Sequence, residues 1–302
     1  PDILSDNMVL QQNTGVRLWG KATPNAAVKV HPSWAKMTTT VRTDSKGNWQ
    51  ANIQTPTATF TPQTLTFSDG ELIILKNILI GEVWLASGQS NMEMPLNGYW
   101  NCPVKGANEI IALSGKNKGI RFATVPKTPA YEPQETVAGK WMESNPNNTP
   151  WFSATAYHFA QTLYHSLDVP VGIIVCSWGG SRVESWTNRE ILETYPDINL
   201  SKKGIEAVEE WKRPLVMYNG MLKPLTNFTI KGFIWYQGES NVGKHEDYPG
   251  RFATMVELWR KDWGLGNLPF YYAEIAPWIY GDGELGTSGA LLREAQFKSQ
   301  FI

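Results

Sequence analysis

From residue 81 onward, apolar runs of strand length alternate with longer segments that carry apolar residues at helical spacing. The strand-like runs are Val83–Ala86, Val171–Cys176, Gly232–Tyr236 and Pro269–Ala276. Each is nearly continuous in apolar residues, which is typical of parallel strands that are buried on both faces. Strands that alternate with helices predict an α/β fold, in which helices cover both faces of a parallel sheet.

The helical segments between these strands are marked at their ends. Ser153–Leu167 has apolar residues at helical spacing, and Ser153 stands where a side chain caps the first turn. Arg251–Trp263 has the same spacing and stops at Gly264, a residue type that commonly ends helices. Thr187–Glu190 has the capping-box form, which predicts the start of a further helix.

Residues 1–80 follow a different pattern, in which short β-type runs are separated by turn residues such as those of Asp44–Asn48 and Ser68–Gly70. Regularly spaced short strands with this punctuation predict a small β-sandwich. We therefore expect a β-sandwich domain over residues 1–80 and a second, α/β domain over residues 81–302. The β-type runs are Val16–Trp19, Val28–Val30, Thr39–Arg42, Trp49–Ile53, Leu65–Phe67 and Leu72–Leu75.

Composition argues against several kinds of partner. The 302 residues carry a formal net charge of −1 without a dense run of Lys or Arg, which disfavours nucleic acid and anionic membranes. No apolar stretch approaches the roughly 20 residues that span a bilayer, and no signal peptide is visible. Cys102 and Cys176 are too few for a disulfide framework, and whether they pair stays open. Among the 14 Trp residues, a few exposed ones would suit stacking against sugar rings.

Polar segments that contain glycine follow three of the predicted strands. In an open α/β sheet, ligands bind beyond the carboxyl ends of the strands. We therefore expect these three loops to converge on one edge of the sheet, around a single reacting group. The loops are Ser87–Met92, Ser177–Ser181 and Gln237–Asn241.

Ser90 is the sharpest candidate for chemistry. It follows a strand and a glycine at the expected start of a helix, where a hydroxyl is held exposed beside N–H groups that stabilise an oxyanion. The segment Gly88–Met92 ends in Met rather than in the second glycine of the G-x-S-x-G elbow, which counts against the ordinary α/β-hydrolase fold. The motif alone supports two interpretations equally: a nucleophile, or a serine that only caps a helix.

Three other loop residues have both a functional and an ordinary interpretation. Gly180, the second of a Gly-Gly pair, offers a backbone N–H to a ligand, although most such pairs form tight turns. The amide of Gln237 would reach the same oxyanion, or else satisfy loop carbonyls. Glu239 would orient a loop or bind a hydroxyl, and an ion pair is at least as good an explanation.

Five sequence blocks run in order along nearly the whole chain: Leu4–Gln11, Gly81–Met94, Ser177–Gly180 with Glu184–Trp186, Tyr218–Met221 with Pro224–Leu225, and Ile234–Asn241. Together they resemble the sialate O-acetylesterases, a branch of the SGNH hydrolases. In relatives the first block begins a small β domain, and the second contains the nucleophile. The resemblance implies an SGNH-type, flavodoxin-like parallel sheet with helices on both faces, preceded by the β-sandwich.

The resemblance also implies a function: a serine esterase, without metal or other cofactor, that removes acetyl groups from sugars through an acetyl-enzyme on Ser90. It implies an oxyanion hole made of the N–H groups of Ser90 and Gly180 and the side chain of Gln237. A secreted, periplasmic or lysosomal location and an acetylated carbohydrate as partner are implied as well. The same blocks contain residues that we expect to support the site or bind substrate: Gln89, Asn91, Trp178, Gly179, Glu239 and Asn241.

The general base is missing from this pattern. A serine needs a histidine that is oriented by a carboxylate, and in this family both come from a late D-x-x-H segment, which this sequence lacks. His31 lies in the β region, His158 and His165 share one face of a predicted helix, and His245 alone is near a predicted site loop. Because a helical segment also runs to Ile302 without a Gly or Pro stop, we expect the Asp and His in a further C-terminal segment or a companion chain.

Three functions remain to be compared. The leading hypothesis is an esterase for 9-O-acetylated sialic acid. The first alternative is the same chemistry on acetylated xylan or another glycan, which the long segments 97–150 and 182–224 would decide. The second alternative is a non-catalytic sugar-binding protein on an esterase scaffold, in keeping with many Trp residues and no visible base.

Overall fold

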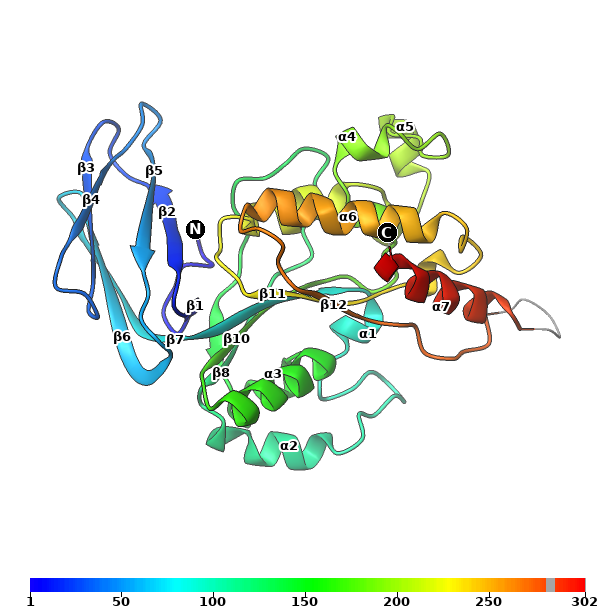
Figure 1. The fold of residues 1–302 in the computed structure, drawn as a ribbon, viewed down its shortest axis with the longest axis horizontal. Helices are drawn as coiled ribbons and strands as arrows, with labels where there is room; N and C mark the ends of the chain where they lie inside the picture. Colours follow the sequence, from blue (N-terminus) through cyan, green and yellow to red (C-terminus); the bar gives the residue numbers. More distant parts are fainter. Residues whose placement is uncertain (281–285, 302) are drawn as a thin grey trace.

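The computed structural model describes residues 1–280 and 286–301 (Figure 1). Its strands are β1 (Val9–Gln11), β2 (Gly15–Lys21), β3 (Ala27–Pro32), β4 (Thr39–Arg42), β5 (Asn48–Gln54), β6 (Thr59–Ser68), β7 (Leu72–Gly88), β8 (Ile120–Thr124), β9 (Trp141–Glu143), β10 (Val171–Ser177), β11 (Gly232–Tyr236) and β12 (Phe270–Ala273). Its α-helices are α1 (Ser90–Glu93), α2 (Ala107–Leu113), α3 (Ala154–Leu167), α4 (Arg189–Leu192), α5 (Lys202–Glu206), α6 (Tyr248–Trp263) and α7 (Ser288–Lys298).

A parallel sheet lies at the centre of the molecule. Its strands follow the order β8-β10-β7-β11-β12, and β9 pairs antiparallel with β8 at one edge. The predicted α/β fold with a parallel sheet is confirmed. The flavodoxin-like strand order is wrong, because that order places the first strand between the second and third, whereas β7 lies between β10 and β11. The long segment after α1 carries the chain two strand positions away to form β8, and β10 then fills the gap.

Successive residues of the central strands enter two separate cores, as the two-residue period of a strand requires. Leu85 and Trp235 lie in one core together with Trp259 of α6. Ala86 lies in the other core together with Tyr157 of α3. Figure 1 shows α6 and α3 on opposite sides of the sheet. The sheet is therefore covered on both faces.

Strand β7 is a single strand of 17 residues, where the sequence predicted two separate runs. Polar residues obscured its continuity, and the structure shows how they are accommodated. Asn77 donates to Glu143 at 2.7 Å and accepts from Arg121 at 3.0 Å, while Glu82 accepts from Gln12 at 2.7 Å. Polar side chains are tolerated inside a sheet when they are hydrogen-bonded. The chain therefore passes from the N-terminal strands into the parallel sheet without a break.

The N-terminal strands surround the first half of β7. β6 pairs antiparallel with it, β3 and β4 continue this sheet outward, and β1 pairs parallel with β7. β2 and β5 form a separate antiparallel pair. Figure 1 places these strands at the opposite end of β7 from α1. An independent β-sandwich domain that ends at residue 80 stays a prediction, since β7 runs across that residue.

The local helix signals are mostly accurate. Ser153 caps α3 through its side chain, and Gly264 ends α6 in the left-handed conformation, as predicted. The capping box at Thr187 is wrong by one residue: Asn188 caps α4, and the Thr187 hydroxyl donates to the carbonyl oxygen of Val183 at 3.1 Å. The sequence analysis did not predict the short strands β1, β8 and β9, which have three to five residues each.

Candidate active site

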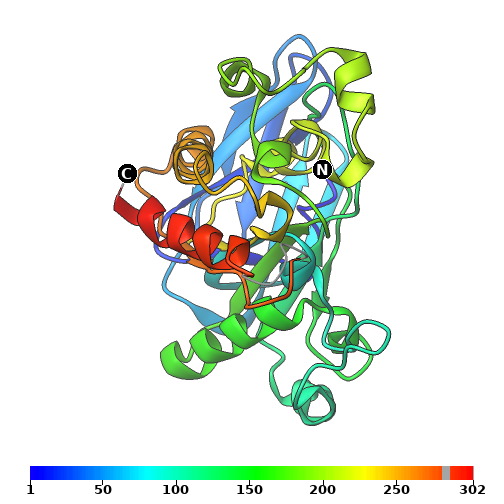
Figure 2. The ribbon, with the colours of Figure 1, turned by 90° about the vertical axis from the view of Figure 1, so that its right-hand side faces the viewer.

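Gly88, the last residue of β7, lets the chain turn sharply into α1. Its φ is +138°, and a Cβ atom at this position would lie 2.1 Å from the carbonyl oxygen of Tyr236 in β11. The N–H of Gln89 donates to the same oxygen at 2.9 Å. Glycine alone fits this close approach. The turn places Ser90 at the first residue of α1. Figure 1 labels this helix, and Figure 2 views the molecule from the right-hand side of Figure 1.

Ser90 does not cap this helix. The N-cap residue of α1 is Gln89, and no side-chain cap hydrogen bond is present. The interpretation of Ser90 as a helix cap is therefore wrong. The residue is partly exposed, and within residues 1–280 and 286–301 its Oγ has no hydrogen-bond partner. Its hydroxyl is accessible and uncommitted, which a nucleophile requires.

The loop after β10 packs directly against Ser90. A Cβ atom built on Gly179 would lie 3.5 Å from the Cβ of Ser90 and 3.2 Å from Oε2 of Glu93. The N–H of Gly179 donates to that Glu93 carboxylate, which also pairs with Lys127 at 2.7 Å. Gly179 thus brings the loop close to the serine, while its own N–H is already used.

The backbone N–H groups of Ser90 and Gly180 are candidate oxyanion donors. Across the described part of the chain, the N–H groups of Ser90 and Gly180 donate to no acceptor. Gly180 has a φ of +80°, which favours glycine. The N–H of Trp178 donates to the carbonyl oxygen of Gly88 at 3.1 Å, so the loops that carry the free groups are tied together. Fixed, unsatisfied donors of this kind stabilise an oxyanion.

Gln237 does not fit its expected oxyanion role. It is fully buried, and its Nε2 donates to the carbonyl oxygen of Ser181 at 3.0 Å and to Oδ1 of Asn241 at 2.7 Å. A side-chain amide has two N–H donors, so none is left for a ligand. Its Oε1 accepts from the hydroxyl of Tyr248 at 3.1 Å. Gln237 therefore holds the loops after β10 and β11 together.

A buried ion pair holds these loops in place. The sequence analysis did not identify its cation, Arg251, as a residue of the site. Arg251 of α6 donates to Glu184 at 2.7 Å and to Asp197 at 2.6 Å. Glu184 also accepts from Asn241 at 3.1 Å, and Oδ1 of Asn241 accepts from the N–H of Val183 at 3.1 Å. Burial tends to raise the pKa of Asp197, but hydrogen bonds from Arg251 and Lys244 lower it. Asn241 is thus a structural residue, because its side chain is buried in this network. The sequence feature that could have identified Arg251 is its position, as a basic residue, on the apolar face of the predicted helix Arg251–Trp263.

Gln89, Asn91 and Glu239 connect α1 to the loop after β11. Oε1 of Gln89 accepts from the N–H groups of Gly238 at 3.1 Å and Ser240 at 3.3 Å. Asn91 donates to Oε1 of Glu239 at 2.6 Å. Burial raises the pKa of the Glu239 carboxyl, although the bond from Asn91 acts in the other direction. These residues fix the position of the helix that begins at Ser90.

Trp178 is buried beside the same loops, and Lys127 Nζ lies 5.7 Å from the centre of its ring. It therefore supports the site rather than exposing a surface to substrate.

Cys102 is exposed, Cys176 is buried, and both are free. Among the described residues, no group of three or more His, Cys, Asp or Glu is placed to hold a metal ion. Nor is any helix of this part of the chain long and apolar enough to cross a bilayer.

None of the four histidines hydrogen-bonds to Ser90 within the residues that the structure describes. His31 lies on β3, where its Nδ1 is 3.2 Å from the Thr38 hydroxyl. His158 and His165 are exposed on α3. His245 precedes α6, and its Nδ1 is buried without a hydrogen-bond partner in the described chain. The structure therefore packs the glycine loop after β10 against Ser90, but within the described residues it brings no histidine into hydrogen-bond contact with that serine.

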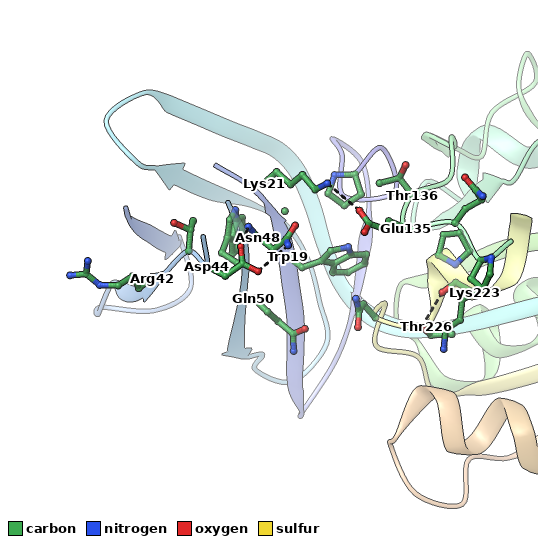
Figure 3. Close-up of a pocket in the computed structure, with 18 residues that line it drawn as sticks. Trp19, Lys21, Arg42, Asp44, Asn48, Gln50, Glu135, Thr136, Lys223 and Thr226 are labelled. Carbon is green, nitrogen blue, oxygen red and sulfur yellow. Dashed lines mark hydrogen bonds and ion pairs between the residues drawn. The ribbon is translucent and has the colours of Figure 1, made fainter. Parts of the chain in front are cut away.

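A large cleft lies elsewhere, between the N-terminal strands and two segments of the α/β region. It has a volume of about 1200 Å³ and includes Trp19 and Gln50 on one side, and Glu135 and Lys223 on the other. Figure 3 shows Trp19 pointing across it toward Lys223 and Thr226. None of the predicted site residues lines this cleft. The volume of this cleft and the candidate reactive groups therefore point to different places, and we place the candidate active site at the loops around Ser90.

A parallel sheet that presents an accessible serine and free backbone N–H groups at its carboxyl edge has the architecture of an ester hydrolase. The chain belongs to the carbohydrate esterase family of sialic acid-specific acetylesterases, whose family model matches residues 80–299.

Known proteins agree with this assignment. The chain is 29% identical to the sialate O-acetylesterases of Pongo abelii and Homo sapiens, over 284 and 287 residues, or 87% of this chain. It spans 53% of the length of each of these two relatives. A solved structure of a carbohydrate acetylesterase from Xanthomonas citri superposes with a TM-score of 0.87 at 32% identity, covering 100% of this chain and 66% of that one.

Proposed function

We propose that the full-length protein hydrolyses O-acetyl esters of carbohydrates through an acetyl-enzyme on Ser90. The observation that carries this proposal is the uncommitted Ser90 hydroxyl beside the free N–H groups of Ser90 and Gly180. The family to which the chain belongs, and the names of its relatives, support the same chemistry.

The reaction follows from these groups in two steps. Ser90 Oγ attacks the acetyl carbonyl carbon, its proton passes to a base, and the two N–H groups bind the negative oxygen that forms. The carbon–oxygen bond to the sugar breaks, and the sugar oxygen takes the proton from the base. Water then attacks the acetyl-enzyme in the same way, releasing acetate and restoring the Ser90 hydroxyl.

The general base is proposed to come from outside residues 1–302. A serine hydroxyl is a weak nucleophile at neutral pH unless a neighbouring group accepts its proton. Because none of His31, His158, His165 and His245 bonds to Ser90 in the described chain, we place the His and its Asp in a further C-terminal segment or in a companion chain.

For the substrate, we propose 9-O-acetylated sialic acid first, in line with the names of the relatives in Pongo abelii and Homo sapiens. Acetylated xylan or another acetylated glycan is the alternative, in line with the broader description of the relative from Xanthomonas citri. We further propose a secreted, periplasmic or lysosomal location, where such glycans occur.

For the domain organisation, we propose a β-sandwich over residues 1–80 and an SGNH-type catalytic domain over residues 81–302. Apolar residues of the β2–β5 pair and of the neighbouring sheet share one core, which supports a sandwich. Examples are Val16 and Leu18 from the first, and Val30 and Leu65 from the second.

A fluorophosphonate probe on the full-length protein tests the proposed nucleophile. Ser90→Ala should abolish labelling and reduce acetate release by on the order of 10³-fold or more, because no other hydroxyl replaces the nucleophile. Ser166→Ala, an exposed serine on α3, is the matched control and should change neither. Wild-type protein that neither labels nor releases acetate would leave the alternative, a non-catalytic sugar-binding protein. Acetate release from acetylated sialic acid, compared with acetylated xylan, then identifies the sugar.

A further inference from the structure

Trp211 lies directly against Gly180, whose backbone N–H is one of the proposed oxyanion donors. It belongs to the short helical turn Glu210–Lys212, in the long segment between β10 and β11. A Cβ atom built on Gly180 would lie 2.5 Å from Cδ1 and 3.1 Å from Nε1 of Trp211. The five-membered edge of the indole therefore fills the space that a side chain at residue 180 would occupy. Trp211 as a whole is nevertheless 43% exposed.

Packing and hydrogen bonding do not account for this exposed ring. Among the described residues, Trp211 is part of neither hydrophobic core, and its Nε1 has no hydrogen-bond partner. Trp259 and Trp263, in contrast, are fully buried, and each donates its indole N–H to a carbonyl oxygen at 3.0 Å. Lys212, next to Trp211, pairs at 3.3 Å with Glu209, the residue that precedes this turn. The turn thus presents an uncommitted aromatic surface at the edge of the site.

We infer that Trp211 is a specificity-determining residue, whose exposed indole stacks on the apolar face of the sugar ring while the acetyl carbonyl is held at the Gly180 N–H. This inference rests on the proposed function. A pyranose presents a face of C–H groups that an indole covers well, because the aromatic face is negative and the C–H hydrogens are positive. A small alkyl acetate has no such face, so the contact distinguishes sugar esters from simple ones.

The test compares two kinds of ester with the full-length protein. Acetate release is measured from 9-O-acetylated sialic acid, from acetylated xylo-oligosaccharide and from ethyl acetate. We expect Trp211→Ala to raise KM about tenfold for the sugar ester that the wild type hydrolyses, as befits the loss of one aromatic contact. The value of kcat, and kcat/KM for ethyl acetate, should change less than about twofold. Trp211→Phe should restore most of the loss, and Trp151→Ala, at a tryptophan that is 66% exposed, should have no effect.

Two results would overturn the inference: an unchanged KM for the sugar ester, or an equal loss with ethyl acetate, which would mean that Trp211 only supports the Gly180 loop. If the wild type releases acetate from no ester, the proposed function fails. Calorimetric titration with N-acetylneuraminic acid and xylotriose then decides the inference separately. Binding that is lost in Trp211→Ala and kept in Trp151→Ala supports it, whereas equal binding by both variants, or no binding by the wild type, overturns it.

Discussion

The two ends of β7 differ in what they offer a ligand. The amino-terminal half pairs antiparallel with β6, and the cleft of about 1200 Å³ lies in the same N-terminal region of the fold, although no residue of β7 lines it. Two of the charged side chains that line this cleft are paired with each other, Lys21 with Glu135 at 3.1 Å. The carboxyl end is more closely packed, and yet it leaves the Ser90 hydroxyl and the Gly180 N–H without partners in the described chain. A reactive site needs polar groups that are held in place without a hydrogen-bond partner. The volume of a cleft gives no information on such groups.

Two glycines at opposite ends of β7 have similar φ angles but differ in how closely other atoms approach them. Gly88 (φ +138°) ends β7, and a Cβ atom added there would lie 2.1 Å from the Tyr236 carbonyl oxygen, whereas one added to Gly70 (φ +130°), before β7, would have nothing within 4 Å. We expect Gly88→Ala to lower the free energy of unfolding by at least about 5 kcal/mol, since a backbone oxygen cannot yield without disrupting the β7–β11 pairing. Gly70→Ala should cost only about 1–2 kcal/mol of backbone strain and leave acetate release unchanged.

Urea unfolding of both variants, with acetate release at a temperature where each is folded, checks this prediction. Similar losses of stability would show that the positive φ alone matters, and that the close approach at Gly88 has no special role.

The ion pairs at the two ends should also differ. Arg251 is buried, with a side chain 8% exposed, and it bonds to Glu184 and Asp197, whereas Lys21 and Glu135 are 65% and 79% exposed. Removing one partner of a buried pair leaves an unpaired charge, so we expect Arg251→Ala to cost about 3–5 kcal/mol. Lys21→Ala should cost under about 1 kcal/mol, because water screens an exposed pair.

Thermal and urea unfolding of the two alanine variants provide the measurement. Acetate release should fall in Arg251→Ala as well, because Glu184 anchors Asn241. An Arg251→Ala protein as stable as the wild type would contradict the view that this network holds the site loops.

The smallest expected effect is a pH dependence of opposite sign at the two ends. Burial raises the pKa of Glu239 above its usual 4.5, so its contribution to stability is full below that pH and is lost as the pH rises through the folded pKa. Hydrogen bonds from Thr23 hold the pKa of Asp69 below 3.8, so its contribution is full above that pH and is lost as the pH falls through the folded pKa.

Unfolding free energies measured between pH 3 and 7 test both signs. Glu239→Gln should gain stability relative to the wild type as the pH rises from about 4 to 7. Asp69→Asn should be slightly less stable than the wild type at pH 7, and the difference should shrink below about pH 4. Parallel pH profiles for the two variants would contradict the opposite environments assigned to these carboxyl groups.

Much of this arrangement follows from the sequence because it is local. Four apolar runs, the Ser153 cap and the Gly264 stop each depend on a few neighbouring residues, and each predicted element is present. The position of Ser90 after a glycine at the end of a strand was likewise readable, as was the convergence of three loops, because parallel strands end at the same edge of a sheet.

Only the tertiary structure decided which polar groups have hydrogen-bond partners and which remain without one. The sequence left both Gln237 and Gly180 as oxyanion donors, but long-range bonds to Ser181 and Asn241 use the Gln237 amide, while the Gly180 N–H stays free. The continuity of β7 and the contact between Trp211 and Gly180 also join residues that are far apart in the chain. A hydrogen bond is satisfied by whichever group lies within reach, and distance in space is set by the packing of the whole fold rather than by the order of residues.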